Sequence, residues 1–421
     1  MRLILRLAVR NVWRNKRRSL LTLLAVLIPV ALLDLVWGFL GAFERSLFEN
    51  TVRLETGHLQ IHKAGYKKVG QALPLIRDVE PVLRALQEDP EIEAYAVRLE
   101  LPALASSAAA EGEGSRSRGV LLQGLDPEGA ARVNVFPRWV REGRYFTAED
   151  RATAVVGRQL LQKLKLGLGD RLVLLIAHPE VGAAVLLPEI VGVFDIPSRE
   201  LSRGVVQAPL EAVRAAIRQE RAATSVLALV RNVQGPWDSP RIAAVAERLQ
   251  RKLGEGYVVE TWEALAPQAV GLLRILKPIN IGFMTIFFAL AGLVVLNTLY
   301  LNVLERIHEL GVVLALGAGG RRVLAMITAE ALVLAGVGAL IGSAVGVALV
   351  ARWSQGLHLP SVYKEVYAQI GLEPVLYLAM TPGEALLSAG AMLLVALGAA
   401  WLPARYAARL EPTEAMRAAA A

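Results

Sequence analysis

Four long apolar runs constrain this chain more than any other feature of its sequence. They cover residues 19–42, 278–303, 323–350 and 384–402. A helix rising about 1.5 Å per residue needs roughly 20 residues to cross the apolar core of a bilayer, and each run has about that length or more. With 54% hydrophobic and only 20% charged residues, the chain is too apolar for an ordinary soluble protein. The sequence therefore predicts a membrane protein with a four-span α-helical transmembrane domain.

The basic residues predict the orientation of these spans. Seven arginines and lysines and no acidic residue precede the first run, whereas residues 353–383 carry one lysine and two glutamates. By the positive-inside rule the N-terminus lies in the cytoplasm, and four spans return residues 403–421 there. The first run is longer than the apolar part of a secretory signal, so an uncleaved anchor is expected. Topology accounts for much of the net charge of +8, and no nucleic acid partner is expected.

Residues 1–18 have the pattern of an amphipathic helix. Arginines recur at every fourth position opposite an apolar stripe; they are Arg2, Arg6, Arg10, Arg14 and Arg18. This spacing predicts a helix that lies along the cytoplasmic surface of the membrane. The alternative is a charged anchor without a helical role.

The predicted topology places residues 43–277 outside the cytoplasm, and their sequence pattern predicts a large folded α+β domain. The stretches GHLQIHK and EAYAVRLE alternate like half-buried strands on either side of a helical stretch, and residues 203–230 indicate strand, helix and strand. These two βαβ-type units flank a strand-rich subdomain, expected as an insertion at about residues 135–198. A second and smaller extracytoplasmic loop is expected at residues 351–383.

Motifs that would make this chain an enzyme are missing from its sequence. There is no G-x-x-x-x-G-K-[ST] phosphate loop, no H-E-x-x-H and no G-x-S-x-G, and the chain has no cysteine. His58 and His62 share one face of a predicted strand, but no third ligand lies nearby in sequence, so a solvated strand face is expected rather than a metal site. We therefore expect no catalytic residue, no metal and no cofactor in this chain.

The stretch LERIHELGVVLALGAGG joins the second and third runs and predicts a short cytoplasmic helix over residues 304–317. Leu304, Ile307, Leu310 with Gly311, and Leu314 form one helical stripe, whereas Glu305 and Glu309 lie one turn apart on another face. Glycines from Gly317 onward end the helix before Arg321 and Arg322. Glutamates resting on anionic headgroups would be unfavourable, so the sequence favours a docked protein partner over lipid.

Polar and small residues inside the runs are further candidates. Asp34 is a carboxylate within the first run, about 22 Å along the helix from its cytoplasmic end. It either snorkels to the outer headgroups or makes a polar contact inside the assembly. Gly338, Gly342 and Gly346 recur at every fourth residue of the third run, which lets helices approach closely, within one chain or between two subunits.

The chain resembles a known family, the FtsX-like permeases of ABC transporters, which includes the lipoprotein-releasing LolC/LolE and macrolide-exporter MacB types. The resemblance covers almost the whole chain and is carried by LAVRNVWRNKRRSLLTLLAV, by the segment around residues 297–346 and by PARYAARLEPTEAMR. The most specific pattern is E-R-x-x-E-x-G-x-x-x-A-L-G-A. It falls on Glu305, Arg306, Glu309, Gly311, Ala315, Leu316, Gly317 and Ala318.

The resemblance implies a function for the short helix, as the coupling helix that sits in a cleft of a cytoplasmic ATPase. It implies two copies of a LolD- or MacB-type ATPase that binds the ATP and magnesium, and a second permease chain in a homodimer or heterodimer, all at the bacterial inner membrane and in contact with its lipid. Stalks at about residues 43–56 and 262–277 would carry ATP-driven motion to the outer domain. That domain would extract or export a lipoprotein, a lipid or another hydrophobic substrate. The alternative is a signalling regulator that uses the same motion to control an extracytoplasmic hydrolase.

Overall fold

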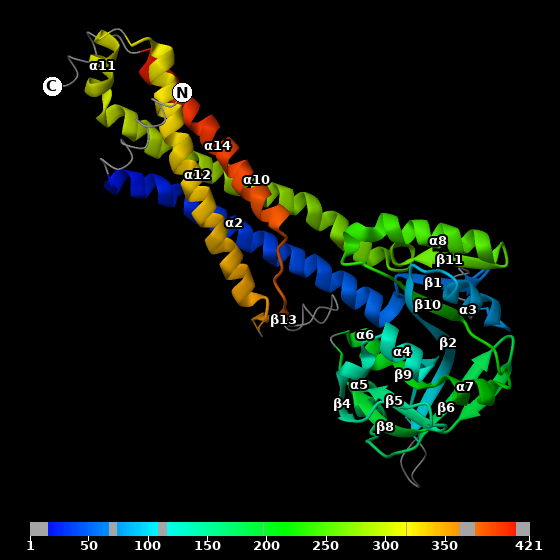
Figure 1. Cartoon of the computed structure of the whole chain (residues 1–421). Coiled ribbons are helices and arrows are strands. Elements are labelled where there is room, and N and C mark those ends of the chain that lie inside the picture. The colour runs from blue at the N-terminus through cyan, green and yellow to red at the C-terminus, as the bar shows by residue number, and fades with distance from the viewer. Residues whose placement is uncertain are drawn as a thin grey trace. The chain divides into compact units, whose positions relative to one another are not determined.

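A computed structural model describes most of the chain. The described residues are 16–66, 74–107, 116–196, 198–316, 318–360, 362 and 375–409. Residues 1–15 of the predicted surface helix lie outside them. The chain divides into two compact units, whose elements are labelled in Figure 1. The helical unit comprises Met1–Phe43, Arg274–His358 and Val375–Ala421, and the α+β unit comprises Glu44–Leu273 and Leu359–Pro374.

Four long helices contain the four predicted runs. They are α2 (Lys16–Thr51), α10 (Pro267–Glu305), α12 (Gly320–Trp353) and α14 (Pro382–Ala408). All four are long and apolar enough to cross a membrane. A capping box begins α14, in which Thr381 and Glu384 each bind the other's backbone N–H. The prediction of a four-span helical membrane protein is confirmed.

Small side chains fill the centre of the helical unit. Its buried cluster combines α2, α10, α12 and α14 through Val26, Val30, Ala291, Val295, Leu299, Ala331, Ala335, Ala339, Met392, Ala396 and Ala400. Alanines at these positions let the helices approach closely, which is how helices associate where lipid offers no hydrophobic driving force. The large side chains point outward instead, as Leu340, Leu386 and Leu394 do with exposed fractions above 70%.

The first part of the α+β unit is a ferredoxin-like β-α-β-β-α-β arrangement. Its strands are β1 (Leu59–Lys63), β2 (Ile92–Ser107), β10 (Ser225–Val230) and β11 (Tyr257–Thr261). They lie in the order β11-β1-β10-β2 with every neighbouring pair antiparallel. Helix α3 (Glu80–Gln87) follows β1 and α8 (Ser239–Leu253) follows β10, and both bury apolar residues in the core that also contains Leu59 and Ile61.

The remaining strands extend this sheet beyond β2. They are β3 (Ser117–Leu125), β9 (Val205–Pro209), β5 (Thr153–Gly157), β8 (Glu189–Phe194) and β4 (Val140–Gly143), in that order, with β6 (Leu172–His178) and β7 (Gly182–Leu186) attached to the end of β2. The predicted strand-rich segment 135–198 thus contains β4 to β8. Its strands join the common sheet through the pairs β5–β9 and β2–β6.

Two further predictions for the α+β unit can be compared with its strands. The predicted strand, helix and strand of residues 203–230 are β9, α7 (Leu210–Ile217) and β10, which confirms the pattern. The predicted solvated face of His58 and His62 is wrong, because both side chains are buried. The alternation of β1 indicates two faces, but it does not show that both are covered.

His58 lies at the point where the ends of two long helices meet the sheet. Its Nδ1 accepts a hydrogen bond from the Val230 N–H at 2.9 Å, and its ring stacks on Phe48 of α2. Phe48 in turn meets Trp262, the first residue of α9 (Trp262–Leu265), edge to face at 5.0 Å between ring centroids. Burial, with a smaller contribution from Arg53, lowers the pKa of His58 to about 4.

Candidate functional site

The predicted cytoplasmic helix is shorter than expected, because the backbone breaks at Arg306. Arg306 has φ −108° and ψ 13°, outside the α-helical region, and it separates α10 from α11 (Ile307–Ala315). Leu304 and Glu305, which the sequence placed on the short helix, are therefore the last residues of α10. Leu316 follows the end of α11, and Gly317 lies outside the described residues.

The inner face of α11 packs on the chain's own helices. Leu310 is 3% exposed and Gly311 is buried. The cluster around Leu310 takes one residue from α10, two from α12 and two from α14; they are Val303, Val323, Ile327, Ala404 and Ala407. This corrects the expectation that Leu310 faces a docked partner. An apolar stripe marks the face that is buried but not the molecule that buries it.

The outer face of α11 combines acidic and apolar side chains. The exposed residues of α11 are His308, Glu309, Val312, Val313 and Ala315, and they are flanked by exposed Glu305 before the helix and Leu316 after it. Leu316 is 83% exposed, whereas Ile307 and Leu314 of the predicted stripe are half-buried. Of the predicted coupling residues, those that are exposed are Leu304, Glu305, Glu309, Ala315 and Leu316.

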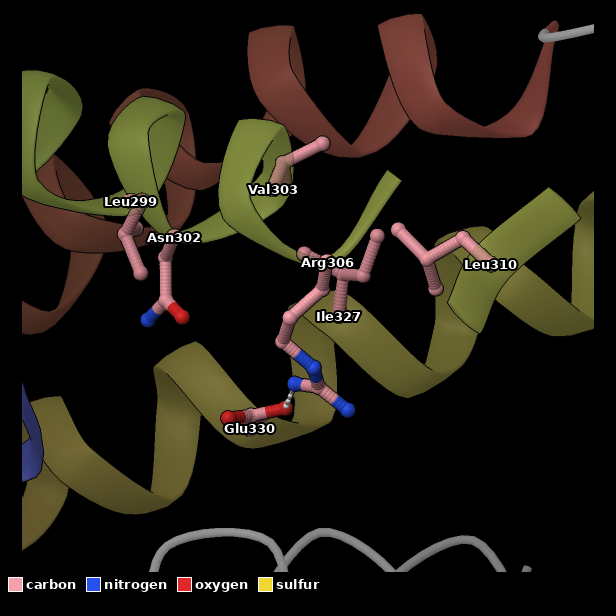
Figure 2. A pocket seen from close by; sticks show the side chains of 7 residues that line it. All are labelled: Leu299, Asn302, Val303, Arg306, Leu310, Ile327 and Glu330. Carbon is pink, nitrogen blue, oxygen red and sulfur yellow. Dashed lines mark hydrogen bonds and ion pairs between the residues drawn. The ribbon is translucent and has the colours of Figure 1, made fainter. Parts of the chain in front are cut away.

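Arg306 is turned inward and pairs with a glutamate of the third long helix (Figure 2). Its Nη1 lies 2.9 Å from Oε2 of Glu330 in α12, and its Nε lies 3.3 Å from Oε2 of Glu309 in α11. The side chains of Arg306 and Glu330 are 14% and 10% exposed. Glu330 was not predicted, although an ionisable residue inside an apolar run is itself a signal of function.

A cavity of about 20 Å³ lies beside this ion pair, lined by Leu299, Asn302, Val303, Arg306, Leu310, Ile327 and Glu330 (Figure 2). That volume admits roughly one water-sized sphere. Asn302 is 7% exposed, and its Oδ1 has no hydrogen-bond partner among the described residues. The corner between α10 and α11 is therefore polar inside and loosely packed.

A second polar contact lies within the bundle. Asp34 of α2 is fully buried, and its Oδ1 accepts a short hydrogen bond from the Ser388 hydroxyl of α14. Its side chain is thus directed into the helical unit and not toward lipid headgroups, which answers the question that the sequence left open. Ser388 had no signal in the sequence, because a serine is common in membrane helices and lies 354 positions away.

The three glycines of α12 pack on α2 of the same chain. A Cβ at Gly338 would lie 3.0 Å from the Cβ of Val26, and one at Gly342 would lie 2.6 Å from the Leu27 carbonyl oxygen. One at Gly346 would lie 2.5 Å from the Cβ of Asp34. Of the two alternatives for this stripe, packing within one chain is the one that the structure contains.

Two family descriptions match the chain. The MacB-like periplasmic core domain matches residues 19–251, more than half of the chain, and the FtsX-like permease C-terminal family matches residues 281–412. The chain belongs to the FtsX/MacB-like permease family. The second match covers most of α10, α11, α12 and α14, and so includes the Arg306–Glu330 pair of this permease.

Two curated relatives align with almost the whole length of this permease. The macrolide export ATP-binding/permease protein MacB of Rhodospirillum rubrum is 27% identical over 98% of this permease and 60% of its own length. The protein of the same name in Agrobacterium fabrum is 23% identical over the same shares. The permease therefore spans about 60% of the length of these relatives. An uncharacterized ABC transporter permease of Methanocaldococcus jannaschii is 28% identical over 41% of each chain.

Solved structures similar to the permease are of isolated domains. The periplasmic region of MacB from Actinobacillus actinomycetemcomitans covers 52% of the permease and 94% of its own chain, with 11% identity and a TM-score of 0.35. The extracellular domain of the noncanonic ABC-type transporter YknZ from Gram-positive bacteria covers 48% and 99%, with 14% identity and a TM-score of 0.33.

Among the described residues, no three His, Cys, Asp or Glu side chains come together as metal ligands. Inside the helical unit, Arg306 binds Glu330 and Asp34 binds Ser388. Both contacts join one helix or corner to another.

Proposed function

We propose that this permease is the membrane subunit of a MacB- or LolCDE-type ABC transporter, in which a cytoplasmic ATPase docks on α11. The observation that carries the proposal is the two-sided character of α11. Its inner face is held by Leu310 and by the corner at Arg306, whereas its outer face exposes glutamates beside Val312, Val313 and Leu316. A membrane surface is a poor match for that outer face, because anionic lipids repel carboxylates.

The proposed assembly contains two permease chains and two ATPase domains, which bind the ATP and magnesium. The phosphate loop needed for ATP hydrolysis is missing from these 421 residues, so the ATPase domains must be supplied from outside them. The termini and α11 would lie on the cytoplasmic side of the inner membrane, in accord with the basic residues before α2. The two chains could be identical or different.

Motion would reach the α+β unit through α2 and α10. Both helices continue beyond their apolar runs, α2 to Thr51 and α10 from Pro267, so each links the two units without an intervening loop. Driven by ATP, the α+β unit would then act on a lipoprotein, a lipid or another hydrophobic molecule outside the cytoplasm.

Leu316→Asp tests the docking surface. The side chain is 83% exposed, so the substitution should leave folding of the permease unchanged while placing a charge in the contact. We expect loss of copurified ATPase and about tenfold weaker binding, as for an interface residue contributing about 1.4 kcal/mol. Glu309→Lys, which reverses a charge on the same face, should act in the same direction.

Leu187→Asp is the matched control, because Leu187 is 54% exposed in the α+β unit. Copurified ATPase and permease-dependent ATP turnover are measured for each variant at equal permease abundance. The proposal requires that only the α11 variants lose them. Wild-type values for both α11 variants would show that the ATPase does not dock on this helix.

A further inference from the structure

The Arg306–Glu330 ion pair fastens the corner between α10 and α11 to a neighbouring helix. Leu310 fixes α11 by apolar contact, which is non-directional and tolerates sliding and rotation. The Arg306 guanidinium instead points at two carboxylates that belong to different helices, Glu309 on α11 and Glu330 on α12. The backbone at Arg306 is not helical, so the α10 helix does not itself set the direction of α11.

We propose that Arg306 is a positioning residue that clamps α11 to α12 by bridging Glu309 and Glu330, and so holds the outer face of α11 in the orientation that a docked ATPase requires. This inference rests on the proposed function of α11, but the clamp itself is measurable without any ATPase. It assigns Arg306, Glu309 and Glu330 an internal role, whereas exposed Leu316 makes the external contact.

Arginine suits this clamp better than lysine. Its planar guanidinium presents several N–H donors in a fixed fork and can bind two carboxylates at once, whereas a lysine ammonium is a compact point charge on a flexible stem. The pair with Glu330 is largely removed from solvent, with exposed fractions of 14% and 10%. Removing one partner from such a pair leaves a buried charge uncompensated, which is strongly unfavourable.

The test uses the full permease, which has no native cysteine, so that spin labels can be attached at introduced cysteines alone. One pair of labels at Val313 on α11 and Leu332 on α12 measures the clamp; both side chains are exposed. A second pair at Leu340 on α12 and Leu394 on α14 measures the bundle, and both of these side chains are 71% exposed. Distances are recorded in detergent without ATPase for wild type, Glu330→Gln and Arg306→Lys.

We expect both variants to broaden the Val313–Leu332 distance distribution and to leave the Leu340–Leu394 distribution unchanged. The charge exchange Arg306→Glu with Glu330→Arg should narrow the first distribution in part, because it restores opposite charges between the corner and α12 but places a carboxylate beside Glu309. An unchanged Val313–Leu332 distribution in both single variants would overturn the clamp. Equal broadening of both distributions would overturn it too, because the pair would then hold the whole bundle and not α11.

ATP turnover then tests the consequence for coupling. With the ATPase present, Glu330→Gln should lower permease-dependent turnover by at least about tenfold, because it leaves the Arg306 charge without its partner on α12, and the exchanged pair should recover part of it. If α11 docks no ATPase, Leu316→Asp leaves copurification unchanged while the distance measurements still report the clamp. The two proposals can therefore fail independently.

Discussion

Gly346 of α12 leaves room for Asp34 of α2. A Cβ added at Gly346 would come to 2.5 Å from the Asp34 Cβ and 2.8 Å from its Oδ2. On its other side Asp34 accepts the hydrogen bond from Ser388 of α14. Three membrane helices thus meet at one fully buried carboxyl group, and the glycine at every fourth position of α12 is what lets α2 approach to that distance.

Gly346→Ala should destabilise the helical unit, because the new methyl group would overlap the Asp34 side chain. Overpacking of this kind costs about 1–3 kcal/mol. Gly336→Ala is the matched control on the same helix, since a Cβ at Gly336 would meet no atom within 4 Å. The thermal unfolding midpoint in detergent should fall for the first variant and not for the second. Equal midpoints would mean that α2 does not pack on Gly346.

Asp34→Leu should impair transport while leaving membrane insertion intact, whereas Asp34→Asn should retain most of both. Asparagine has nearly the same shape and still offers an oxygen to the Ser388 hydroxyl. Leucine removes that acceptor, and the loss of a buried hydrogen bond costs about 1–3 kcal/mol. Insertion itself should be favoured, by up to about 2.5 kcal/mol near a helix centre. Transport by the leucine variant at the wild-type rate would show that the contact with Ser388 is dispensable.

A soluble fragment of residues 44–273 should fold, and it should be more stable than a fragment of residues 56–260. The shorter piece lacks Phe48 and Trp262, which are 0% and 1% exposed and pack edge to face. Loss of one buried aromatic side chain costs about 3–5 kcal/mol. Urea unfolding measures the difference, and Phe48→Ala in the longer fragment should reproduce much of it. If the two fragments unfold at the same urea concentration, the ends of α2 and α10 do not belong to this core.

His58 should make the stability of the 44–273 fragment depend on pH between about 6.5 and 4. Its pKa is lowered from 6.5 to about 4 in the folded state, so in this window the unfolded chain binds more protons than the folded one. Stability is therefore fully present above pH 6.5 and falls as the pH drops toward 4, by about 3 kcal/mol in all.

His58→Asn is the variant for comparison, since its side-chain oxygen can accept the Val230 N–H without titrating. Its absolute stability will be lower, because the ring stacked on Phe48 is lost. Only the slope of unfolding free energy against pH is decisive, and it should be shallower between pH 6.5 and 4 than in the parent fragment. Parallel slopes would show that the imidazole titrates normally.

The sequence was most informative where one residue pattern determines one element. The four apolar runs lie within α2, α10, α12 and α14, and the alternating stretches around β1, β2 and β10 form strands. Periodicity did not show what covers a face. Leu310 and His58 were both misjudged for that reason, since the layers that bury them come from helices and strands far away along the chain.

The contacts of the candidate site could not be predicted because they depend on tertiary register. Arg306 and Glu330 are 24 residues apart and belong to different parts of the helical unit, so their pairing depends on the tertiary fold. The rule that an ionisable residue inside a span indicates function was applied to Asp34, and it would also have indicated Glu330. No sequence rule would have found Ser388, whose role is visible only beside Asp34.

The first and last strands of the ferredoxin-like arrangement are hydrogen-bonded neighbours, and a short helical segment joins each of them to a long helix. Leu59 at the start of β1 pairs with Thr261 at the end of β11, and the Trp262 N–H donates to the His58 carbonyl oxygen at 3.1 Å. Both helices are thus attached at the same end of a single strand pair. A force that pulls α2 away from α10 would break the hydrogen bonds between β1 and β11 one after another. A force that moves both helices together would leave these hydrogen bonds unloaded. If α2 and α10 carry ATP-driven motion as proposed, this strand pair would pass on their common motion and would yield to their separation.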